Sequence, residues 1–466
     1  MAVWSVVKIS QFVGAFRLDA EFWQPDYLTV ERAVEKVLHL RLGELVTSLR
    51  KGVFNILAES YVEQGIPFYR SSNVGQIIPK EAGLAFITPA KHVLEWKTGL
   101  KRGDIMLAKT GKEAASVVLC EECNISQDVI GIRVDRKKVN PFYLAVFLNT
   151  SPGMLQMRRW FQGQVQLRLS LPDARQILVP ILPESLQKRI EDSVHQAERE
   201  YANALEGMSE AERLLASALG LNKLDLSPNL FYERPCLDLI VARRFDAEYF
   251  QPKYDTLLSA IRRHGAVRLG DAVRQPVRRG ISPTYFDDGD LTVINSQQVG
   301  KVAVELDDNR MTREALFDLK SEDNRTGVVR KGDVLLNSTG RITIGRCQCL
   351  LDDVVAVVDN HIAIIRPQAD LDPVYLASFL NTMPGLMQTE RGYTGSSGQI
   401  ELRPDVIEDY LIWKAPQKLQ LAIRQQIERA HAARREGRRL LQQAKVEIER
   451  LILGSAKKNQ NHVRSS

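Results

Sequence analysis

Two long segments of the chain place apolar residues at alternating steps of four and three. The first series is Ile190, Val194, Ala197, Tyr201, Ala204, Met208, Ala211, Leu215 and Ala218. The second lies 233 positions later and is apolar or small at every position except Arg434: Ile423, Ile427, Ala430, Arg434, Gly437, Leu441, Ala444, Ile448 and Leu451. This spacing is typical of a coiled-coil seam. It predicts two long helices, each of about 35 residues and about 50 Å.

The two predicted helices differ in charge. Residues 184–219 contain four basic and eight acidic side chains, whereas residues 418–450 contain nine basic and four acidic ones. Opposite charge favours pairing of the helices with each other over pairing of either helix with its own copy in another chain. We therefore expect the two helices to pair antiparallel within one chain, as two copies related by an approximate two-fold axis would.

The segments outside these helices also occur twice. Arg17-Leu-Asp-Ala-Glu-Phe-Trp-Gln-Pro-Asp-Tyr27 returns 227 positions later as Arg244-Phe-Asp-Ala-Glu-Tyr-Phe-Gln-Pro-Lys-Tyr254. Further pairs of matching segments are 41–44 with 268–271, 101–104 with 330–333, and 141–150 with 373–382. In each copy, short strand-like segments with Gly and Asp turns precede one compact helix and a polar loop. The chain is therefore predicted to be a tandem duplication.

This order predicts an α+β fold with two tandem, pseudo-symmetric globular domains separated by two long helices that form an antiparallel coiled coil. The expected boundaries are an N-terminal segment 1–39, a first domain 40–182, a first spacer helix 183–221, a linker with the repeated segment 222–265, a second domain 266–415, a second spacer helix 416–452 and a disordered tail 453–466.

Composition narrows the class of protein. The formal net charge of +6 on 466 residues is mildly basic, which permits a nucleic-acid partner without requiring one. No apolar run approaches the roughly 18 residues of a membrane-spanning helix, so a cytoplasmic location is expected. Cys120-Glu-Glu-Cys123 has the spacing of a zinc or redox pair, but Cys347-Gln-Cys349 does not, and no His neighbours either pair. We expect free thiols and no metal.

Over residues 40–452 the chain resembles the specificity subunits of type I restriction-modification systems. The resemblance rests on the tandem layout, on the Pro-x-x-Leu-Gln starts of the long helices (Pro183 to Gln187 and Pro416 to Gln420), and on the polar loop Gly395-Ser-Ser-Gly-Gln399. Members of this family carry two target-recognition domains, each followed by a spacer helix. A related phage-defence methylation system could use the same scaffold.

The resemblance implies a non-catalytic subunit that recognises a bipartite target in double-stranded DNA. It also implies two copies of a DNA adenine methyltransferase subunit as partners, together with a restriction subunit that translocates DNA. S-adenosylmethionine, ATP and Mg²⁺ would then belong to those partners, and this chain would hold no cofactor. An adenine flipped out of the duplex would be the substrate of the methyltransferase.

Polar loops of the two domains supply the candidate DNA contacts. Arg pairs with guanine, Asn and Gln pair with adenine, Ser and Thr pair with either base, and Lys and Arg hold phosphates. The first domain offers Arg70, Ser71, Ser72, Asn73, Lys109, Thr110, Lys112, Arg158, Arg159, Gln162 and Gln164. The second offers Asn295, Ser296, Gln297, Gln298, Asn337, Ser338, Thr339, Arg341, Arg391, Tyr393, Ser396, Ser397 and Gln399.

No catalytic set is visible in the sequence. Asn140-Pro-Phe-Tyr143 resembles a motif of amino-methyltransferases, but its counterpart begins with Asp372, and both are better interpreted as helix starts with a capping residue and a proline. A nuclease would need an acidic metal cluster, which is not seen. A structural adaptor with twin protein-binding domains and no DNA readout remains the alternative. The repeated segment at 17–27 and 244–254 either braces each domain or docks a partner twice.

Overall fold

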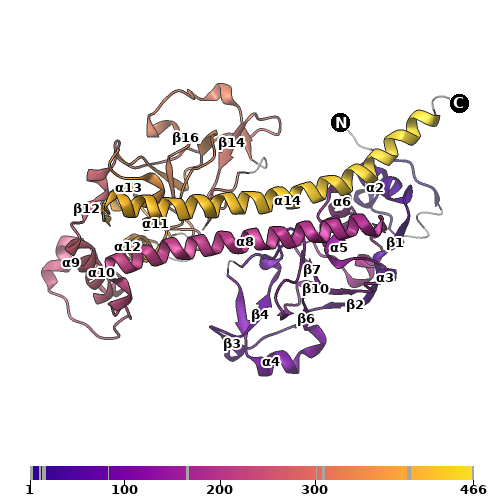
Figure 1. Cartoon of the computed structure of the whole chain (residues 1–466), viewed down its shortest axis with the longest axis horizontal. Coiled ribbons are helices and arrows are strands. Elements are labelled where there is room, and N and C mark those ends of the chain that lie inside the picture. Colours follow the sequence, from indigo (N-terminus) through magenta and orange to yellow (C-terminus); the bar gives the residue numbers. More distant parts are fainter. Residues whose placement is uncertain are drawn as a thin grey trace. The chain divides into compact units, whose positions relative to one another are not determined.

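The computed structural model describes residues 4–9, 12, 17–81, 83–163, 167–300, 302–306, 310–395 and 400–463. The chain divides into two compact units. The first comprises Met1–Arg199 and Glu436–Ser466, and the second comprises Glu200–Arg435. Each unit contains one globular domain and part of both long helices (Figure 1).

The first unit is built on three small sheets. An antiparallel sheet has the order β2 (Val46–Lys51), β10 (Val129–Val134), β7 (Ile105–Ala108) and β8 (Ala115–Val117). A second sheet has the order β3 (Tyr61–Val62), β5 (Ala85–Ile87), β4 (Ile66–Tyr69), β9 (Glu122–Ile125) and β6 (Leu100–Lys101), with β4 and β9 parallel. The strands β1 (His39–Arg41) and β11 (Leu178–Pro180) form a separate pair.

The second unit repeats this architecture. Its antiparallel sheet has the order β13 (Arg278–Arg279), β20 (Ile362–Ile365), β17 (Val334–Asn337) and β18 (Cys347–Cys349). Its second sheet has the order β15 (Met311–Thr312), β14 (Leu291–Ile294), β19 (Val355–Val358) and β16 (Val328–Arg330), with β14 and β19 parallel. The strands β12 (Val267–Arg268) and β21 (Leu411–Ile412) pair as β1 and β11 do.

Four of the helices named here for each unit have a counterpart at the equivalent place in the other. The first unit has α2 (Pro25–Glu35), α3 (Leu42–Leu45), α4 (Pro89–Leu94), α5 (Pro141–Leu148), α6 (Ser151–Trp160) and α7 (Leu171–Ala174). The second has α9 (Cys236–Ala242), α10 (Pro252–Arg263), α11 (Pro373–Leu380), α12 (Met383–Gly392) and α13 (Pro404–Glu408). Every residue of α5 is buried, because this short helix is apolar on all sides and lies inside the domain.

The residues before α5 and α11 act as helix caps, as the sequence predicts. The Asn140 side chain accepts hydrogen bonds from the backbone N–H groups of Phe142 and Tyr143. The Asp372 carboxylate accepts the equivalent pair at the start of α11. The carbonyl oxygen that makes Asn140 resemble a catalytic residue is therefore occupied in stabilising the first turn of a helix.

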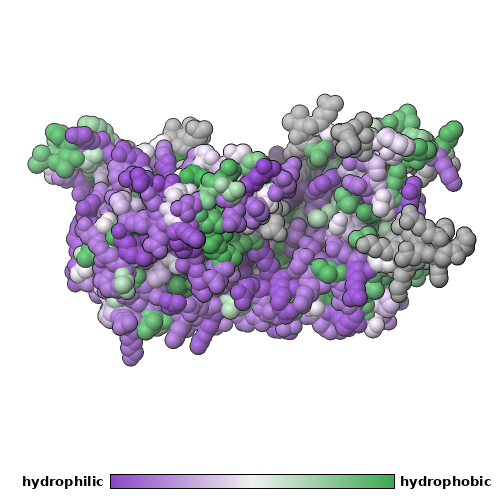
Figure 2. All heavy atoms as spheres, turned by 90° about the horizontal axis from the view of Figure 1, so that it is seen from above, coloured by the Kyte–Doolittle hydropathy of each residue, from purple (hydrophilic) through white to green (hydrophobic). Residues whose placement is uncertain are grey.

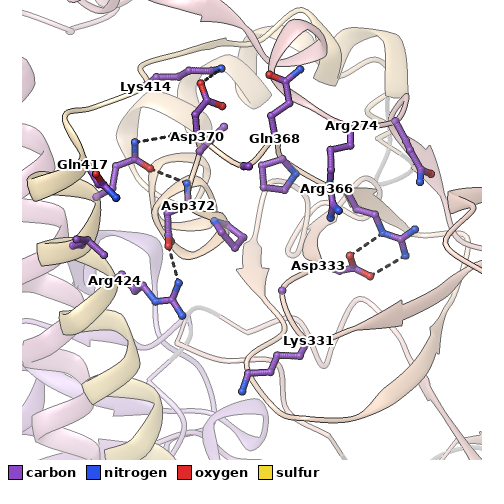
Figure 3. Close-up of a pocket in the computed structure, with 18 of the residues that line it drawn as sticks. Arg274, Lys331, Asp333, Arg366, Gln368, Asp370, Asp372, Lys414, Gln417 and Arg424 are labelled. Atoms are coloured by element: carbon purple, nitrogen blue, oxygen red, sulfur yellow. Dashed lines mark hydrogen bonds and ion pairs between the residues drawn. The ribbon is translucent and has the colours of Figure 1, made fainter.

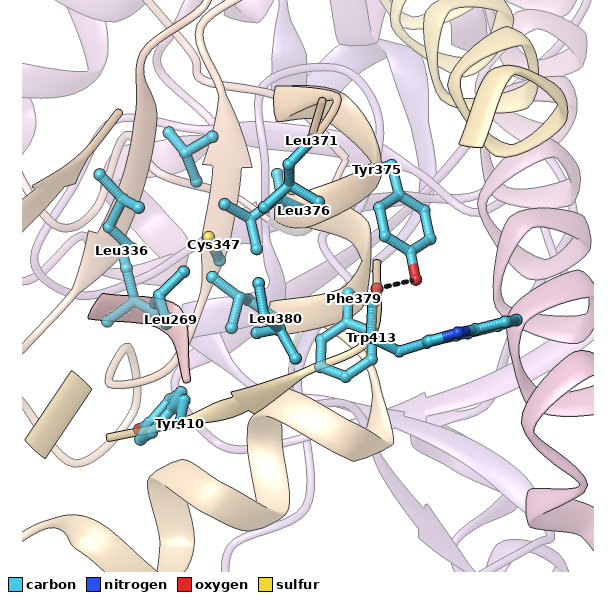
Figure 4. Packing of buried hydrophobic residues seen from close by; sticks show 14 of the residues in the cluster. Leu269, Leu336, Cys347, Leu371, Tyr375, Leu376, Phe379, Leu380, Tyr410 and Trp413 are labelled. Atoms are coloured by element: carbon cyan, nitrogen blue, oxygen red, sulfur yellow. Dashed lines mark hydrogen bonds between the residues drawn. The ribbon is translucent and has the colours of Figure 1, made fainter. Parts of the chain in front are cut away.

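A hydrophobic cluster connects the elements of the second unit (Figure 4). It includes Leu269 and Leu336, the helix α11, and the strand β21. Within it, the Tyr375 hydroxyl donates to the Trp413 carbonyl at 2.8 Å. The equivalent bond in the first unit joins Tyr143 to the Pro180 carbonyl at 2.7 Å. Each domain thus ties its compact helix to the strand that precedes the long helix.

The long helices α8 (Glu184–Leu219) and α14 (Gln417–Val463) pair antiparallel, which confirms the prediction. In the first unit, Arg189 of α8 forms an ion pair with Glu447 of α14 at 2.6 Å. In the second unit, Gly207 lies so close that a Cβ atom there would be 3.1 Å from the Cβ of Ala430. The contacted residue on α14 changes from 447 to 430 as the position on α8 changes from 189 to 207, so the helices run in opposite directions.

The seam of the pair differs from the predicted one at its last step. Leu219 and Ile452 are buried, whereas Ala218 and Leu451 are more exposed. The correction is the same in both helices, since these positions are also 233 apart. The buried positions Ala211, Leu215 and Leu219 are thus separated by two successive steps of four. This shift arises because a straight α-helix has 3.6 residues per turn and drifts from a strict seven-residue repeat. The structure also continues α14 to Val463, beyond residue 452, where the sequence predicts a disordered tail.

Hydrophilic residues cover most of the face shown in Figure 2, and apolar residues gather in smaller patches. The helix α9 has no buried residue. Large apolar side chains are exposed on this helix and in the chain on either side of it: Leu230, Phe231, Leu237, Ile240, Val241 and Phe245. None of the helices in the described part of the chain combines the length and hydropathy that a bilayer span requires.

Candidate nucleic-acid interface

The first predicted cluster of the first domain is a tight turn after β4. The backbone N–H of Arg70 donates to Asn73 Oδ1 at 3.1 Å, and Asn73 Nδ2 donates to the Lys80 carbonyl at 3.1 Å. Asn73 is fully buried, whereas Arg70 and Ser72 are exposed. The Asn73 amide therefore stabilises the turn, and contact with a base would require breaking both bonds. Arg70 and Ser72 are the side chains that the turn presents to solvent.

The matching cluster in the second domain has the same backbone frame. The N–H of Asn295 donates to Gln298 Oε1 at 2.8 Å, so Gln298 takes the place of Asn73. In both copies the carbonyl of this fourth residue accepts a bond from a residue seven positions later, Lys80 at 2.7 Å and Glu305 at 2.8 Å. Gln298 is buried and Gln297 is exposed. Gln297 thus occupies the position of Ser72.

The second cluster lies beside the first in each domain. In the first domain, the Ser71 hydroxyl donates to the Thr110 carbonyl at 3.1 Å. In the second, Asn337 Nδ2 donates to the Ser296 carbonyl at 2.8 Å. The structure therefore brings these two predicted clusters together. Thr110 is buried.

Lysine and arginine occupy equivalent positions at the end of this second cluster. Lys112 is partly buried, and this burial, with a smaller contribution from the nearby charge of Lys80, lowers the pKa of its ammonium group to about 8. Lys109 is also partly buried, and Arg341 is exposed. A partly desolvated ammonium group beside a second cation suits an anion such as a phosphate.

In the second domain, Asn337 and Ser338 are fully buried, which leaves Thr339 and Arg341 accessible. The Ser338 hydroxyl donates to the His361 carbonyl at 3.0 Å. Thr339 Oγ1 lies 2.7 Å from His361 Nδ1. Thr339 therefore contacts His361, which is not among the DNA contacts predicted from the sequence.

Residues of the third predicted cluster bond to different partners, and some of them lie outside the described residues. Arg158 forms an ion pair with Glu113 at 2.7 Å, and this hydrogen-bonded carboxylate raises the pKa of the guanidinium group. Gln162 Nε2 donates to Asp173 Oδ2 at 3.0 Å. Four further members of this cluster lie outside the described residues: Gln164, Ser396, Ser397 and Gln399.

Arg159 and Arg391 pack against the repeated segments of their own units. In the first unit, the Phe22 ring is contacted by the guanidinium groups of both Arg17, at 4.9 Å from its centroid, and Arg159, at 4.2 Å. Arg159 is buried, donates to the Phe22 carbonyl at 3.0 Å, and pairs with Glu31 at 2.8 Å. These contacts fasten the repeated segment to α6, as a brace would.

The second unit repeats the same arrangement with Tyr249. Its ring is contacted by the guanidinium groups of both Arg244, at 4.5 Å, and Arg391, at 4.7 Å. Arg244 also donates to the carbonyls of Arg391 and Tyr393, both at 3.4 Å. Tyr393 therefore contributes its backbone to the brace. Each copy of the repeated segment thus supplies one arginine and the aromatic ring that both guanidinium groups contact, as expected of a brace.

A turn between two strands lies beside both clusters in each domain and was missed in the sequence. In the first domain, the N–H of Ser126 donates to the Tyr69 carbonyl at 2.9 Å, and the N–H of Lys109 donates to the Asp128 carbonyl at 3.0 Å. This turn borders a hollow of about 320 Å³ that the first cluster also lines. The lining residues are Val53, Phe54, Asn55, Ile56, Tyr61, Phe68, Arg70, Ser71, Ser72, Ser126, Gln127 and Asp128. The pairing of distant strands creates this hollow, so sequence spacing gave no signal for it.

A larger cavity of about 940 Å³ lies in the second unit (Figure 3). None of the predicted DNA contacts lines it. Its charges are largely paired: Arg366 with Asp333 at 2.8 Å, Lys414 with Asp370 at 2.8 Å, and Arg424 with Asp372 at 2.8 Å. The Arg424 pair joins the globular domain to α14, the Lys414 pair lies just before this helix, and the Arg366 pair lies within the domain. The cavity therefore lies where the domain is attached to the long helix.

All five cysteines are thiols in the structure. Cys120 and Cys123 interact with each other, and this hydrogen bond lowers the pKa of Cys120 and raises that of the buried Cys123. Across the described ranges, no three His, Cys, Asp or Glu side chains are grouped so as to hold a metal ion.

No protein-family model matches the chain, and no curated protein sequence matches it. Solved structures do. The S subunit of a type I restriction-modification system from M. genitalium has a TM-score of 0.40 at 11% identity, covering 89% of this chain and 94% of that chain. The HsdS subunit from Thermoanaerobacter tengcongensis has a TM-score of 0.27 at 14% identity, covering 90% and 97%. The type IIG restriction endonuclease BpuSI covers 40% of this chain with a TM-score of 0.30 at 10% identity.

Proposed function

We propose that this chain is the DNA sequence-specificity subunit of a type I restriction-modification complex, or of a related phage-defence methylation complex. Each domain reads one half of a bipartite target in double-stranded DNA. The chain itself is non-catalytic and acts in the cytoplasm. Two copies of a DNA adenine methyltransferase, and a restriction subunit, bind it and supply the chemistry together with S-adenosylmethionine, ATP and Mg²⁺.

The observation that carries this proposal is the paired turn at 70–73 and 295–298. In both turns the backbone N–H of the first residue donates to the side-chain amide oxygen of the fourth, yet the exposed side chains differ, with Ser72 in one and Gln297 in the other. A scaffold kept constant under divergent polar side chains suits two modules that read different base sequences. An enzyme that duplicated a catalytic site would need the opposite pattern, with the functional side chains kept.

The proposed roles divide by exposure. Arg70, Ser72 and Gln297 are accessible and are assigned to base edges. Lys112 and Arg341 are assigned to phosphates, because each lies at the end of the second cluster and neither has an ion-pair partner among the described residues. Phosphate contacts set affinity and register, whereas base contacts set the sequence.

The test is the methylation motif of the complex that the chain forms with its methyltransferase, read by sequencing the modified DNA. The wild-type complex should modify a motif with two separate half-sites. Gln297→Ala should make one position of one half-site degenerate, since a good bidentate contact discriminates by about 1–3 kcal/mol.

Gln298→Ala is the matched control, because Gln298 is the adjacent amide and is buried in the turn. It should lower the melting temperature without altering the motif. A wild-type complex that binds and methylates without sequence preference would contradict the proposal. Absence of DNA binding with and without partners would instead favour the structural adaptor, to which the exposed apolar residues around α9 would offer a docking surface.

A further inference from the structure

The turns at 126–129 and 359–362 correspond to each other bond for bond. Each is closed by a backbone bond across four residues, from Val129 N–H to the Ser126 carbonyl at 2.9 Å, and from Ile362 N–H to the Asp359 carbonyl at 3.2 Å. The second residue of each turn is an amide, Gln127 in the first domain and Asn360 in the second. The two turns therefore present the same chemical group from the same backbone position.

Both turns lie between the two predicted clusters of their own domain. In the first domain, Ser126 bonds to Tyr69, which directly precedes Arg70, and Asp128 bonds to Lys109. In the second domain, the N–H of Asp359 donates to the Ile294 carbonyl at 3.0 Å, and the N–H of Ser338 donates to the His361 carbonyl at 2.8 Å. The equivalent bonds fix the turn at the centre of the candidate interface in each case.

The side-chain amides of these turns are not used by the fold. Asn360 is exposed and Gln127 is partly exposed, and neither amide has a hydrogen-bond partner among the described residues. Asn73 and Gln298 differ in this respect, because their amides hold a turn together. An amide that is fixed at its backbone and free at its donor and acceptor can pair with the N6 and N7 edge of adenine.

The first domain adds room for such a contact. The hollow of about 320 Å³ is lined by Gln127 together with Arg70 and Ser72, and by Phe54, whose side chain is 70% exposed. An exposed phenylalanine can contact a thymine methyl group. In the second domain, Ser282 stands one residue after the bridge between Ile281 and Asp359, where the first domain has Phe54 after Val53. The two domains thus differ around a common amide.

We propose that Gln127 and Asn360 are specificity-determining residues, and that each reads an adenine in the half-site of its own domain. This inference rests on the proposed function, and it adds a reading element to the clusters found in the sequence. The turn acts with the exposed residues of the first cluster, so one half-site is read by Gln127 with Arg70 and Ser72, and the other by Asn360 with Gln297.

The experiment is selection from a randomised duplex library by the complex of the full chain with its methyltransferase, followed by sequencing of the bound DNA. Gln127→Ala should reduce discrimination at one A·T position of one half-site by about 5- to 150-fold, and Asn360→Ala should do so in the other half-site. Gln127→Glu keeps the size of the side chain and should move the preference at that position from adenine to cytosine, whose amino group a carboxylate accepts.

Gln64→Ala serves as control, because Gln64 is an exposed amide in the turn between β3 and β4 and does not line the hollow. An unchanged motif in the Gln127 and Asn360 variants would overturn the inference while the bipartite motif of the wild type upheld the proposed function. A uniform loss of binding with the motif intact, or a change in the same half-site for both, would also overturn it. A wild-type complex that selects no motif would refute both proposals.

Discussion

The two domains use the same ion pair in different surroundings. In the second domain, Arg366 and Asp333 are both 5% exposed at their side chains, and Arg366 Nε lies 2.8 Å from Asp333. In the first domain, the equivalent Arg133 lies 2.7 Å from Asp104, but the Arg133 side chain is 47% exposed. In both copies the pair ties the residue before one strand to its neighbour, Asp104 before β7 to β10 and Asp333 before β17 to the residue after β20. In the second domain Arg366 also donates to the carbonyls of Glu322 and Val328, and these contacts accompany its deeper burial.

The attachment of each domain to its long helix shows the same division. Gln187 and Gln420 accept the N–H of Asn140 and Asp372, both at 2.8 Å, in a bond common to the two copies. The neighbouring contact differs, since Asn140 donates to Glu191 at 3.2 Å whereas Asp372 pairs with Arg424 at 2.8 Å. The glutamine bond to the helix cap is therefore common to the two domains, whereas the side chain that contacts the cap residue differs between them.

The largest expected effect comes from breaking the pairing of the long helices. Ile423 and Ile427 are 0% and 3% exposed, so changing both to Asp buries unpaired charge and should lower the free energy of unfolding by several kcal/mol, about 3–5. Leu421→Asp, on the exposed side of the same turn, is the control. Denaturant unfolding measures the effect, and an unchanged midpoint in the double variant would contradict the pairing.

The next effect sharpens the comparison of the two ion pairs. Arg366→Met leaves Asp333 buried without its partner and should cost about 3–5 kcal/mol. Arg133→Met also leaves a buried carboxylate, because the Asp104 side chain is 8% exposed, but water reaches this pair through the 47% exposed Arg133, so the loss should be smaller, about 1–2 kcal/mol. Both variants are followed by thermal and denaturant unfolding of the full chain. Equal losses in the two domains would show that burial does not govern the strength of this pair.

Much of the frame could be predicted from the sequence. The tandem repeat, the two long helices, their antiparallel pairing and the caps at Asn140 and Asp372 all follow from spacing and local chemistry. The end of the seam at Leu219 and Ile452 could not be predicted, because a helix without a strict heptad drifts by a fraction of a turn. Pattern counting does not resolve such a shift.

The candidate interface was only partly visible in the sequence. Polar residues such as Asn73, Gln298 and Arg159 have the chemistry of DNA contacts, and their burial depends on tertiary partners that sequence spacing does not reveal. Conversely, Gln127 and Asn360 lie in short turns between strands, and only the pairing of those strands places them beside the predicted clusters. Residue type indicated which groups could read bases, and packing decides which are accessible.

A smaller effect tests whether the attachment of each domain to its helix is equivalent. Gln187 also donates to the Leu182 carbonyl, and Gln420 to the Ala415 carbonyl, both at 2.8 Å. Replacing either glutamine by Ala leaves buried backbone groups without partners and should cost about 1–3 kcal/mol in unfolding experiments. Gln425→Ala, at an exposed position of α14, is the control and should change stability little. A loss in one domain only would show that the repeat is not equivalent at this joint.

The smallest effect compares the two residues assigned to phosphates. The pKa of Lys112 is lowered to about 8 in the folded chain, against about 10.5 when exposed, so the folded chain holds this proton less tightly than the unfolded chain does. Below pH 8 the charged form is penalised in the fold, and the penalty disappears as the pH rises from 8 to 10.5. Lys112→Gln should therefore stabilise the free protein by about 1 kcal/mol near neutral pH, after allowance for solvent screening, and by less at pH 10.

DNA should reverse this preference at Lys112, because a phosphate favours the protonated ammonium group. Affinity of the wild-type complex for its target should fall between pH 8 and 10, and Lys112→Gln should remove that dependence while weakening all sequences alike. Arg341→Gln should weaken binding equally at every pH in this range, since a guanidinium group keeps its charge. Fluorescence anisotropy across pH and salt measures both. If Lys112→Gln leaves the pH dependence and the salt dependence of binding unchanged, Lys112 does not contact the DNA backbone, and the two domains hold phosphates at different places.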